Sequence, residues 1–342
     1  MTKLIGNKQV MATLRRLVVA GRVPHSLLFA GPEGVGKRQF ALELARSLVC
    51  HEPQEGVGCG NCSACRRAGV FDIPKFDKGE ESDFVFFSQH PDVGIVLPYK
   101  RILRIGGIRE LEREANFLPY EAPARVFVVD DADKMNDAAS NALLKTLEEP
   151  PSTSYIILIA SRADSLLPTI LSRCQVIRFA PVEAAEIESH LLGTEQFAAD
   201  DAALAARVSG GSVGRALDFV PASFRTQRSL MLEVIKAAVS GDRRELLAAS
   251  EDMTSAANKD EYEEKLGVLG GLIRDVWLLG NGAADTAILN VEIVDELRRL
   301  SQEIDPPTLS AWLSEIETLN ENFIVNINKK IATDALVVGM AG

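Results

Sequence analysis

The sequence predicts an α/β domain with a P-loop and a parallel sheet, followed by an all-helical C-terminal half. Three observations lead to this fold class. A glycine-rich loop at residues 31–37 follows a short apolar run and precedes a helical pattern. Apolar runs that suit buried strands then alternate with helical segments, as in helix-covered parallel sheets. Beyond Pro181 only the helical spacing of apolar residues remains.

The individual elements follow from these patterns. Strands are expected at 26–30, 125–129, 155–160 and 176–179, and helices at 7–20, from 37 to about 48, at 109–116 and at 136–149. Asn136 is placed to cap the last of these, and Pro150 to end it. In the C-terminal half, helices are expected at 185–192, 202–208, 213–219, 229–239, 264–279, 291–300, 308–319 and 325–340.

The length of 342 residues exceeds what one compact core needs. We expect an α/β nucleotide-type domain at 1–181, a small helical lid domain at 182–222 and an all-helical domain at 223–342. Hydrophobic residues make up 46% and charged residues 25%, as in ordinary globular proteins. The lack of a membrane-length apolar run or a signal core predicts a cytoplasmic protein with no membrane contact.

The net charge of −11 is unevenly distributed. Residues 1–182 hold 23 Lys and Arg against 21 Asp and Glu, whereas the remainder holds 14 against 27. An acidic C-terminal half repels a phosphate backbone, so a nucleic-acid contact is expected on the N-terminal half or on a partner. Simple solubility is the alternative explanation.

The loop at 31–37 has the composition of a phosphate cradle. Its glycines let backbone N–H groups turn inward, and the lysine supplies a point charge. The position after the lysine usually carries a hydroxyl that binds Mg²⁺, but Arg38 has no lone pair for a metal. We therefore expect a degenerate site that could hold ATP or ADP without hydrolysing it; a loop that merely turns the chain is the alternative. The expected nucleotide contacts are Gly31, Gly34, Val35, Gly36, Lys37 and Arg38.

Acidic residues follow the strand predicted at 125–129. Asp130 is placed to hold a magnesium-bound water. A hydrolytic base is expected at Asp131, usually as the longer Glu, so the shorter side chain would reach an attacking water poorly. Acidic residues are also common at the ends of strands in α/β proteins, which is the alternative.

Four of the five cysteines lie within residues 50–65: Cys50, Cys59, Cys62 and Cys65. Four thiolates with CxxC spacing and no histidine suit a closed, tetrahedral, structural zinc site. An iron–sulfur cluster, free thiols and disulfides remain open from the spacing alone. The fifth, Cys174, is expected to be a buried apolar thiol.

Two arginines have competing interpretations. Arg173, in Ser172-Arg173-Cys174, precedes the strand at 176–179, and such an arginine is most often a helix cap or a surface ion pair. The alternative is an arginine finger that stabilises charge on a phosphoryl group in a neighbouring subunit. Arg215 could reach nucleotide phosphates or simply occupy a turn at the start of a helix.

Taken together, the motifs resemble the AAA+ clamp-loader family and, within it, the delta-prime type of subunit of bacterial DNA polymerase III. The passages that carry the resemblance are PHSLLFAGPEGVGK (24–37), the four cysteines, HPD (90–92), DDADKMNDAASNALLKTLEEPP (130–151), LLPTILSRCQ (166–175) and NINKKIATDAL (326–336). The segment 70–89 is longer than the resemblance suggests.

The resemblance implies a role in an assembly. In this family a pentameric ring, with gamma/tau-type motor subunits and a delta subunit, places a sliding clamp on primed DNA, and the C-terminal domains form a collar. It implies that Arg173 is an arginine finger acting in trans, that Arg215 is a second-domain sensor, and that the cysteines bind zinc. We thus expect a subunit that is not catalytic alone. The alternatives are an active AAA+ motor ATPase and a zinc-dependent nucleic-acid-binding module.

Overall fold

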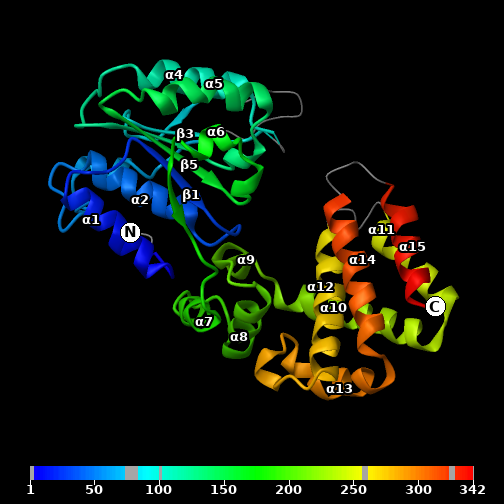
Figure 1. The fold of residues 1–342 in the computed structure, drawn as a ribbon. Helices are drawn as coiled ribbons and strands as arrows, with labels where there is room; N and C mark the ends of the chain where they lie inside the picture. Colours follow the sequence, from blue (N-terminus) through cyan, green and yellow to red (C-terminus); the bar gives the residue numbers. More distant parts are fainter. Residues whose placement is uncertain (1–3, 74–83, 100–101, 256–260, 323–327, 342) are drawn as a thin grey trace. The chain divides into compact units, whose positions relative to one another are not determined.

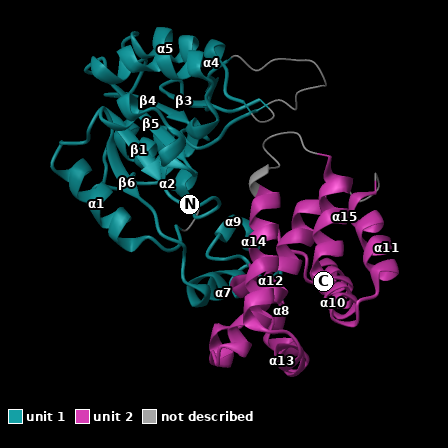
Figure 2. Ribbon diagram, turned by 45° about the vertical axis from the view of Figure 1, so that its right-hand side comes forward, with its two compact units in different colours: residues 1–197, 209–217 teal, residues 198–208, 218–342 magenta. Residues whose placement is uncertain are grey.

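The computed structural model describes residues 4–73, 84–99, 102–255, 261–322 and 328–341. The chain forms two compact units, one of residues 1–197 with 209–217 and one of residues 198–208 with 218–342 (Figure 2). The division at 181/182 and 222/223 into three domains stays a prediction. Part of the long segment 70–89, residues 74–83, lies outside the described residues.

The first unit is built on a six-stranded sheet, which confirms the predicted α/β fold class. The strand order is β2-β3-β4-β5-β1-β6, and only the β2–β3 pair is antiparallel. All four predicted strands are present, whereas the short β2 and β3 were not expected. The strands are β1 (Ser26–Ala30), β2 (Phe86–Phe87), β3 (Val93–Val96), β4 (Arg125–Val129), β5 (Ser154–Ala160) and β6 (Gln175–Arg178).

Helices cover both faces of this sheet (Figure 1). On one face, alternate strand residues such as Phe29 and Val128 pack in a core with residues of α1 and α2. On the other, Leu28 and Phe127 pack in a core with residues of α4 and α5. The helices of this unit are α1 (Lys8–Val19), α2 (Lys37–Val49), α3 (Ser63–Arg67), α4 (Ile105–Ala115), α5 (Asp137–Glu148), α6 (Pro168–Leu171), α7 (Ala184–Leu192) and α9 (Val213–Leu217), with short 3-10 turns η1 (Ala132–Lys134) and η2 (Ala163–Ser165).

Strand register brings distant segments to one edge of the sheet. Ala30 at the end of β1 lies beside Ala160 at the end of β5. The N–H of Asp130, just after β4, donates to the carbonyl of Val96 at the end of β3. The phosphate loop, the acidic segment and the residues after β5 therefore meet at the carboxyl ends of parallel strands, where ligands bind in open α/β sheets.

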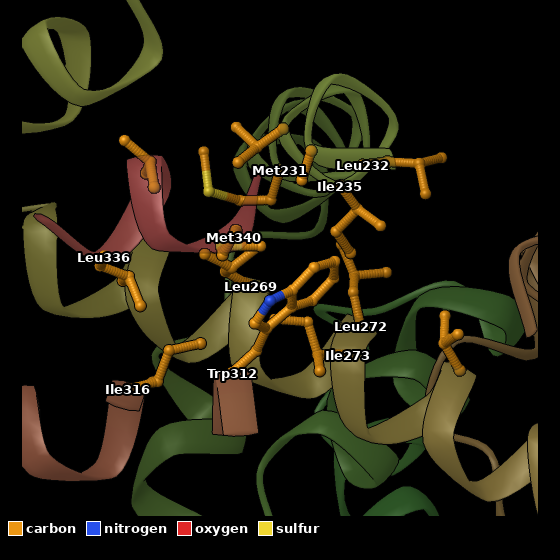
Figure 3. Close-up of a cluster of buried hydrophobic side chains, with 14 of the residues drawn as sticks. Met231, Leu232, Ile235, Leu269, Leu272, Ile273, Trp312, Ile316, Leu336 and Met340 are labelled. Atoms are coloured by element: carbon orange, nitrogen blue, oxygen red, sulfur yellow. The ribbon is translucent and has the colours of Figure 1, made fainter. Parts of the chain in front are cut away.

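The second unit is a helical bundle around one apolar core. Trp312 lies among Leu269, Ile273 and Met340 at its centre (Figure 3). The helix α11 was not predicted, because its sequence is largely polar apart from buried residues such as Leu246. The helices are α8 (Ala199–Val208), α10 (Pro221–Ser240), α11 (Arg243–Thr254), α12 (Tyr262–Gly280), α13 (Val294–Glu303), α14 (Pro306–Asn322) and α15 (Lys329–Met340), with η4 (Asp285–Ala287) and η5 (Val291–Ile293).

Several predicted helix starts differ from the structure: α10 begins at Pro221 where 229 was predicted, and α4 at Ile105 where 109 was predicted. Two further differences lie near the C-terminal end. The helix expected from residue 291 begins at Val294, because Val291–Ile293 forms a 3-10 turn. The last helix begins at Lys329, where the Asn328 side chain accepts hydrogen bonds from two first-turn N–H groups. Residues 325–327, which the prediction included, lie outside the described residues. Among the helices that the structure describes, none has the length and apolarity to cross a membrane.

Candidate functional site

The phosphate loop connects the buried strand β1 to α2. Gly34 and Gly36 adopt left-handed φ angles of 74° and 95°, which glycine tolerates without strain. Within the described residues, the backbone N–H groups of Gly34, Gly36 and Lys37 make no hydrogen bond, whereas the turn at residues 33–34 directs the Val35 N–H toward the Pro32 carbonyl. Successive unpaired donors ahead of a helix form a site for an anion. The loop has the backbone shape of the predicted cradle, and phosphate binding stays a prediction.

Lys37 is folded back onto this loop. Its Nζ donates to the carbonyls of Gly31 at 2.5 Å and Pro32 at 2.6 Å, and to Ser161 Oγ at 3.2 Å. The residue is only 5% exposed, and burial lowers the pKa of the ammonium despite nearby carboxylates. Ser161, just after β5, was not predicted as part of the site, because only the pairing of β1 with β5 brings it next to the phosphate loop.

The two residues at the magnesium position contact each other. Arg38 Nη1 lies 3.2 Å from Asp130 Oδ2, and the carboxylate is 14% exposed. Burial raises the pKa of Asp130, while Arg38 opposes that rise. The Arg38 guanidinium offers only hydrogen-bond donors, and it stands where a P-loop usually has a hydroxyl. It also pairs with the Asp130 carboxylate, which would otherwise be free to orient a metal-bound water.

The neighbouring acidic residues also have partners. Asp131, at the position of a hydrolytic base, pairs with Lys134 Nζ at 2.7 Å. Asp133 accepts the N–H groups of Ser161 and Arg162, so it anchors the segment after β5. The Asp131 carboxylate thus has a lysine partner on one oxygen, and its side chain is 30% exposed.

Helix α9 begins against the phosphate loop. The N–H of Gly214 donates to the carbonyl of Gly34 at 3.0 Å, and a Cβ at Gly34 would lie 2.0 Å from Ser212 Oγ. Arg215 is the next residue and is exposed, with its own N–H bonded to Ser212 Oγ. This contact places the start of α9 beside the loop, and the sensor role of Arg215 stays a prediction.

The four predicted cysteine ligands converge. Their Sγ atoms all lie within 4.8 Å of one another, and both the Cys50–Cys62 and Cys59–Cys65 pairs are 3.9 Å apart. A tetrahedral zinc with about 2.3 Å bonds places its sulfurs roughly 3.8 Å apart, whereas a disulfide needs about 2.05 Å. The cysteines are free thiols in a geometry that could bind a metal ion such as zinc.

Backbone groups support the sulfurs. The N–H groups of Cys59, Cys62 and Cys65 donate to the sulfurs of Cys50, Cys59 and Cys62. Burial opposes ionisation of Cys62, but hydrogen bonds from backbone N–H groups and from the neighbouring thiols together lower the pKa of that thiol to about 6. Hydrogen bonds to the ionised form favour the thiolate that a metal requires.

Arg173 lies at the end of α6. Its Nη1 donates to the carbonyl of Thr169 at 3.1 Å, and its Nη2 is 3.2 Å from Glu148 Oε2. The side chain is 30% exposed and Glu148 is 60% exposed. In this structure Arg173 therefore makes the contacts of a helix cap and of a surface ion pair. The next residue, Cys174, is buried as predicted, and burial raises the pKa of its thiol to about 12.

A buried polar network was missed by the sequence analysis. Asp92 is fully buried and accepts the N–H groups of Tyr120, Glu121 and Ala122. Arg125, also fully buried, lies 3.6 Å from Asp92 and 3.2 Å from Glu114. The HPD tripeptide thus holds the loop between α4 and β4. The only sequence signal was the tripeptide itself, since an arginine opening an apolar strand usually faces solvent.

His90 in the same network is expected to make stability depend on pH. Burial lowers the pKa of His90 below its usual value of 6.5, with Glu121 opposing the shift. The unfolded chain therefore takes up a proton first, so stability is complete above about pH 6.5 and falls as the pH drops below it. We expect His90→Gln to remove a slope of up to about 1.4 kcal/mol per pH unit, measured by urea unfolding between about pH 7 and pH 5. Equal slopes in both proteins would contradict this assignment.

The strand, the phosphate loop and the helix that follows define a P-loop-type α/β domain with a largely parallel sheet. A family model described as "DNA polymerase III, delta subunit" matches residues 6–183. The Escherichia coli protein "DNA polymerase III subunit delta'" is 31% identical, covering 93% of this chain and 89% of that protein. The chain therefore belongs to the family of delta-prime-type clamp-loader subunits of DNA polymerase III, as its motifs predict.

Two further relatives show how far the similarity extends. The Bacillus subtilis subunit delta' is 32% identical over 54% of this chain and 50% of its own length. The Mycobacterium tuberculosis subunit gamma/tau is 31% identical over 61% of this chain, but the match covers only 34% of that protein. The match to the motor-type subunit is thus partial, whereas the match to the Escherichia coli delta' subunit covers nearly the whole chain.

Proposed function

We propose that this chain is a non-hydrolysing subunit of the clamp loader that supplies Arg173 in trans to the ATP site of a neighbouring subunit. The observation that carries the first part is the Arg38–Asp130 pair, which occupies both protein positions of a magnesium site. Asp131 pairs with Lys134 and is shorter than the usual Glu, so it would reach an attacking water poorly. On this proposal ATP or ADP at the loop is a structural ligand.

The contacts of Arg173 are compatible with a finger. Its partner Glu148 is largely exposed, and an exposed ion pair contributes only about 0–1 kcal/mol. A triphosphate carries more charge than one carboxylate and matches the guanidinium fork, so exchanging Glu148 for a phosphate costs little. Buried Cys174 and the short helix α6 hold the backbone on either side.

The partners follow from the family. The relatives are subunits named delta' and gamma/tau, so we propose that this chain assembles with gamma/tau-type and delta subunits in a pentameric ring. Sliding clamp and primed DNA would be reached through that complex. The acidic C-terminal half fits a collar of helices better than a surface that contacts the DNA backbone.

The test of this proposal is Arg173→Ala in the assembled loader. A finger accelerates phosphoryl transfer by about 10³-fold or more, so the one site it serves should become silent and turnover should fall by that site's share. Arg173→Lys should recover little, because an ammonium lacks the planar fork. ATP hydrolysis would be measured with sliding clamp and primed DNA, after confirming assembly by size.

Arg22→Ala is the matched control, because Arg22 is an exposed arginine of the same unit. Hydrolysis at the wild-type rate by the Arg173→Ala assembly would contradict the finger. Turnover by the isolated chain that Lys37→Ala abolishes would instead identify a motor subunit.

A further inference from the structure

We propose that the phosphate loop binds the diphosphate of a nucleotide without a metal ion, with the Arg38 guanidinium taking the place of Mg²⁺. This inference rests on the proposed non-hydrolysing nature of the loop and does not depend on Arg173. The ligand would be a nucleoside di- or triphosphate without a bound metal ion. Hydrolytic P-loops, in contrast, turn over the magnesium complex of the nucleotide.

The cradle itself fits a diphosphate. The N–H groups of Gly34, Gly36 and Lys37 make no hydrogen bond within the described part of the chain, and Lys37 is only 5% exposed. A buried donor without an acceptor costs about 1–3 kcal/mol, which an anionic oxygen would recover. Lys37 rests on two loop carbonyls and one hydroxyl, all neutral groups that a phosphate would replace with a full charge.

Arg38 has capacity left for a ligand. Its side chain is 51% exposed, and within the described residues it spends one donor, from Nη1, on Asp130. A guanidinium carries five N–H donors, so four remain for phosphate oxygens. The contact with Asp130 holds the group at the start of α2, directly after the lysine of the loop.

The same contact disfavours a metal ion. The position that normally offers a hydroxyl oxygen offers only positive N–H groups, and the carboxylate nearby is already neutralised by a cation. A divalent ion would have to displace Arg38 and lie beside its charge. Lys37 and Arg38 supply positive charge for a diphosphate, and Arg215 follows Gly214, whose N–H donates to the loop carbonyl of Gly34.

The experiment is calorimetric titration of the full-length chain with ADP, ATP and inorganic pyrophosphate, with the metal ion of the cysteine cluster retained. Magnesium would be removed by extensive dialysis and not by a strong chelator, because a chelator would also attack the cysteine cluster. We expect binding in magnesium-free buffer, competition between pyrophosphate and ADP, and no gain in affinity when Mg²⁺ is added. Arg38→Thr, which restores a hydroxyl, should weaken magnesium-free binding about tenfold and gain affinity with Mg²⁺.

Arg22→Thr changes the net charge identically on an exposed residue and should bind as the wild type does. The proposal is overturned if the wild type binds no nucleotide, if its affinity rises about tenfold with Mg²⁺, or if pyrophosphate fails to compete. These outcomes concern the isolated chain, so they leave the ATPase test of Arg173 in the assembly unaffected.

Discussion

Loss of the metal from the cysteine cluster is expected to unfold residues 50–69 while the six-stranded sheet stays folded. This segment has little regular structure, namely the five-residue helix α3 and an isolated bridge between Gln54 and Val57. Structural zinc binds small domains with an apparent free energy of about 10–16 kcal/mol. Because the site is not formed in the unfolded chain, this binding free energy stabilises the folded segment. The segment contains too few buried apolar groups to replace that contribution.

Cys62→Ser removes one ligand and is the variant to measure. Native mass spectrometry should show one zinc ion in the wild type and none in the variant. Amide exchange in residues 50–69 should rise to unprotected rates, while that of β1 and β5 stays slow. Ser63→Ala is the control, since Ser63 is exposed and borders the same site. A metal-free wild type, or unchanged exchange in the variant, would contradict the assignment.

The disturbance should also reach a neighbouring loop. Arg46 on α2 donates to the carbonyl of Cys65, and Arg67 on α3 lies 2.7 Å from Glu121. Glu121 belongs to the loop that Asp92 holds. Partial loss of protection at residues 120–122 is therefore expected in Cys62→Ser.

Asp92→Ala is expected to destabilise the first unit by about 3–5 kcal/mol, the range for breaking a buried charge pair. Three loop N–H groups lose their common acceptor, and Arg125 keeps its charge at 0% exposure with Glu114 as its remaining acidic partner. Each unsatisfied buried donor costs on its own about 1–3 kcal/mol.

Urea unfolding measures this change in the free energy of unfolding, with amide exchange of the sheet strands reporting on the first unit. Asp92→Asn should be milder, because the amide oxygen still accepts a hydrogen bond. Asp164→Ala, at an exposed aspartate of η2, should change stability by less than about 0.5 kcal/mol. A loss of stability below about 1 kcal/mol in Asp92→Ala would show that the network is not structural.

The sequence by itself determined the features that are local in the chain. The phosphate loop, the strand before it and the helix after it lie within 24 consecutive residues, residues 26–49, so their order alone predicted the cradle. The cysteine cluster was predicted for the same reason, since its ligands lie within residues 50–65. The helical C-terminal half followed from apolar spacing, although the polar helix α11 and the short strands β2 and β3 did not.

Tertiary structure decided what those features can do. Arg38 and Asp130 are 92 positions apart and meet only because parallel pairing brings the carboxyl ends of β1, β5 and β4 to one edge of the sheet. The Asp92–Arg125 network and the contact between Gly34 and Gly214 depend on the same assembly. Spacing along a chain carries no information about which distant side chains will share a buried site. The sequence thus predicted a degenerate phosphate loop, and only the fold placed Arg38 on the carboxylate that a metal would need.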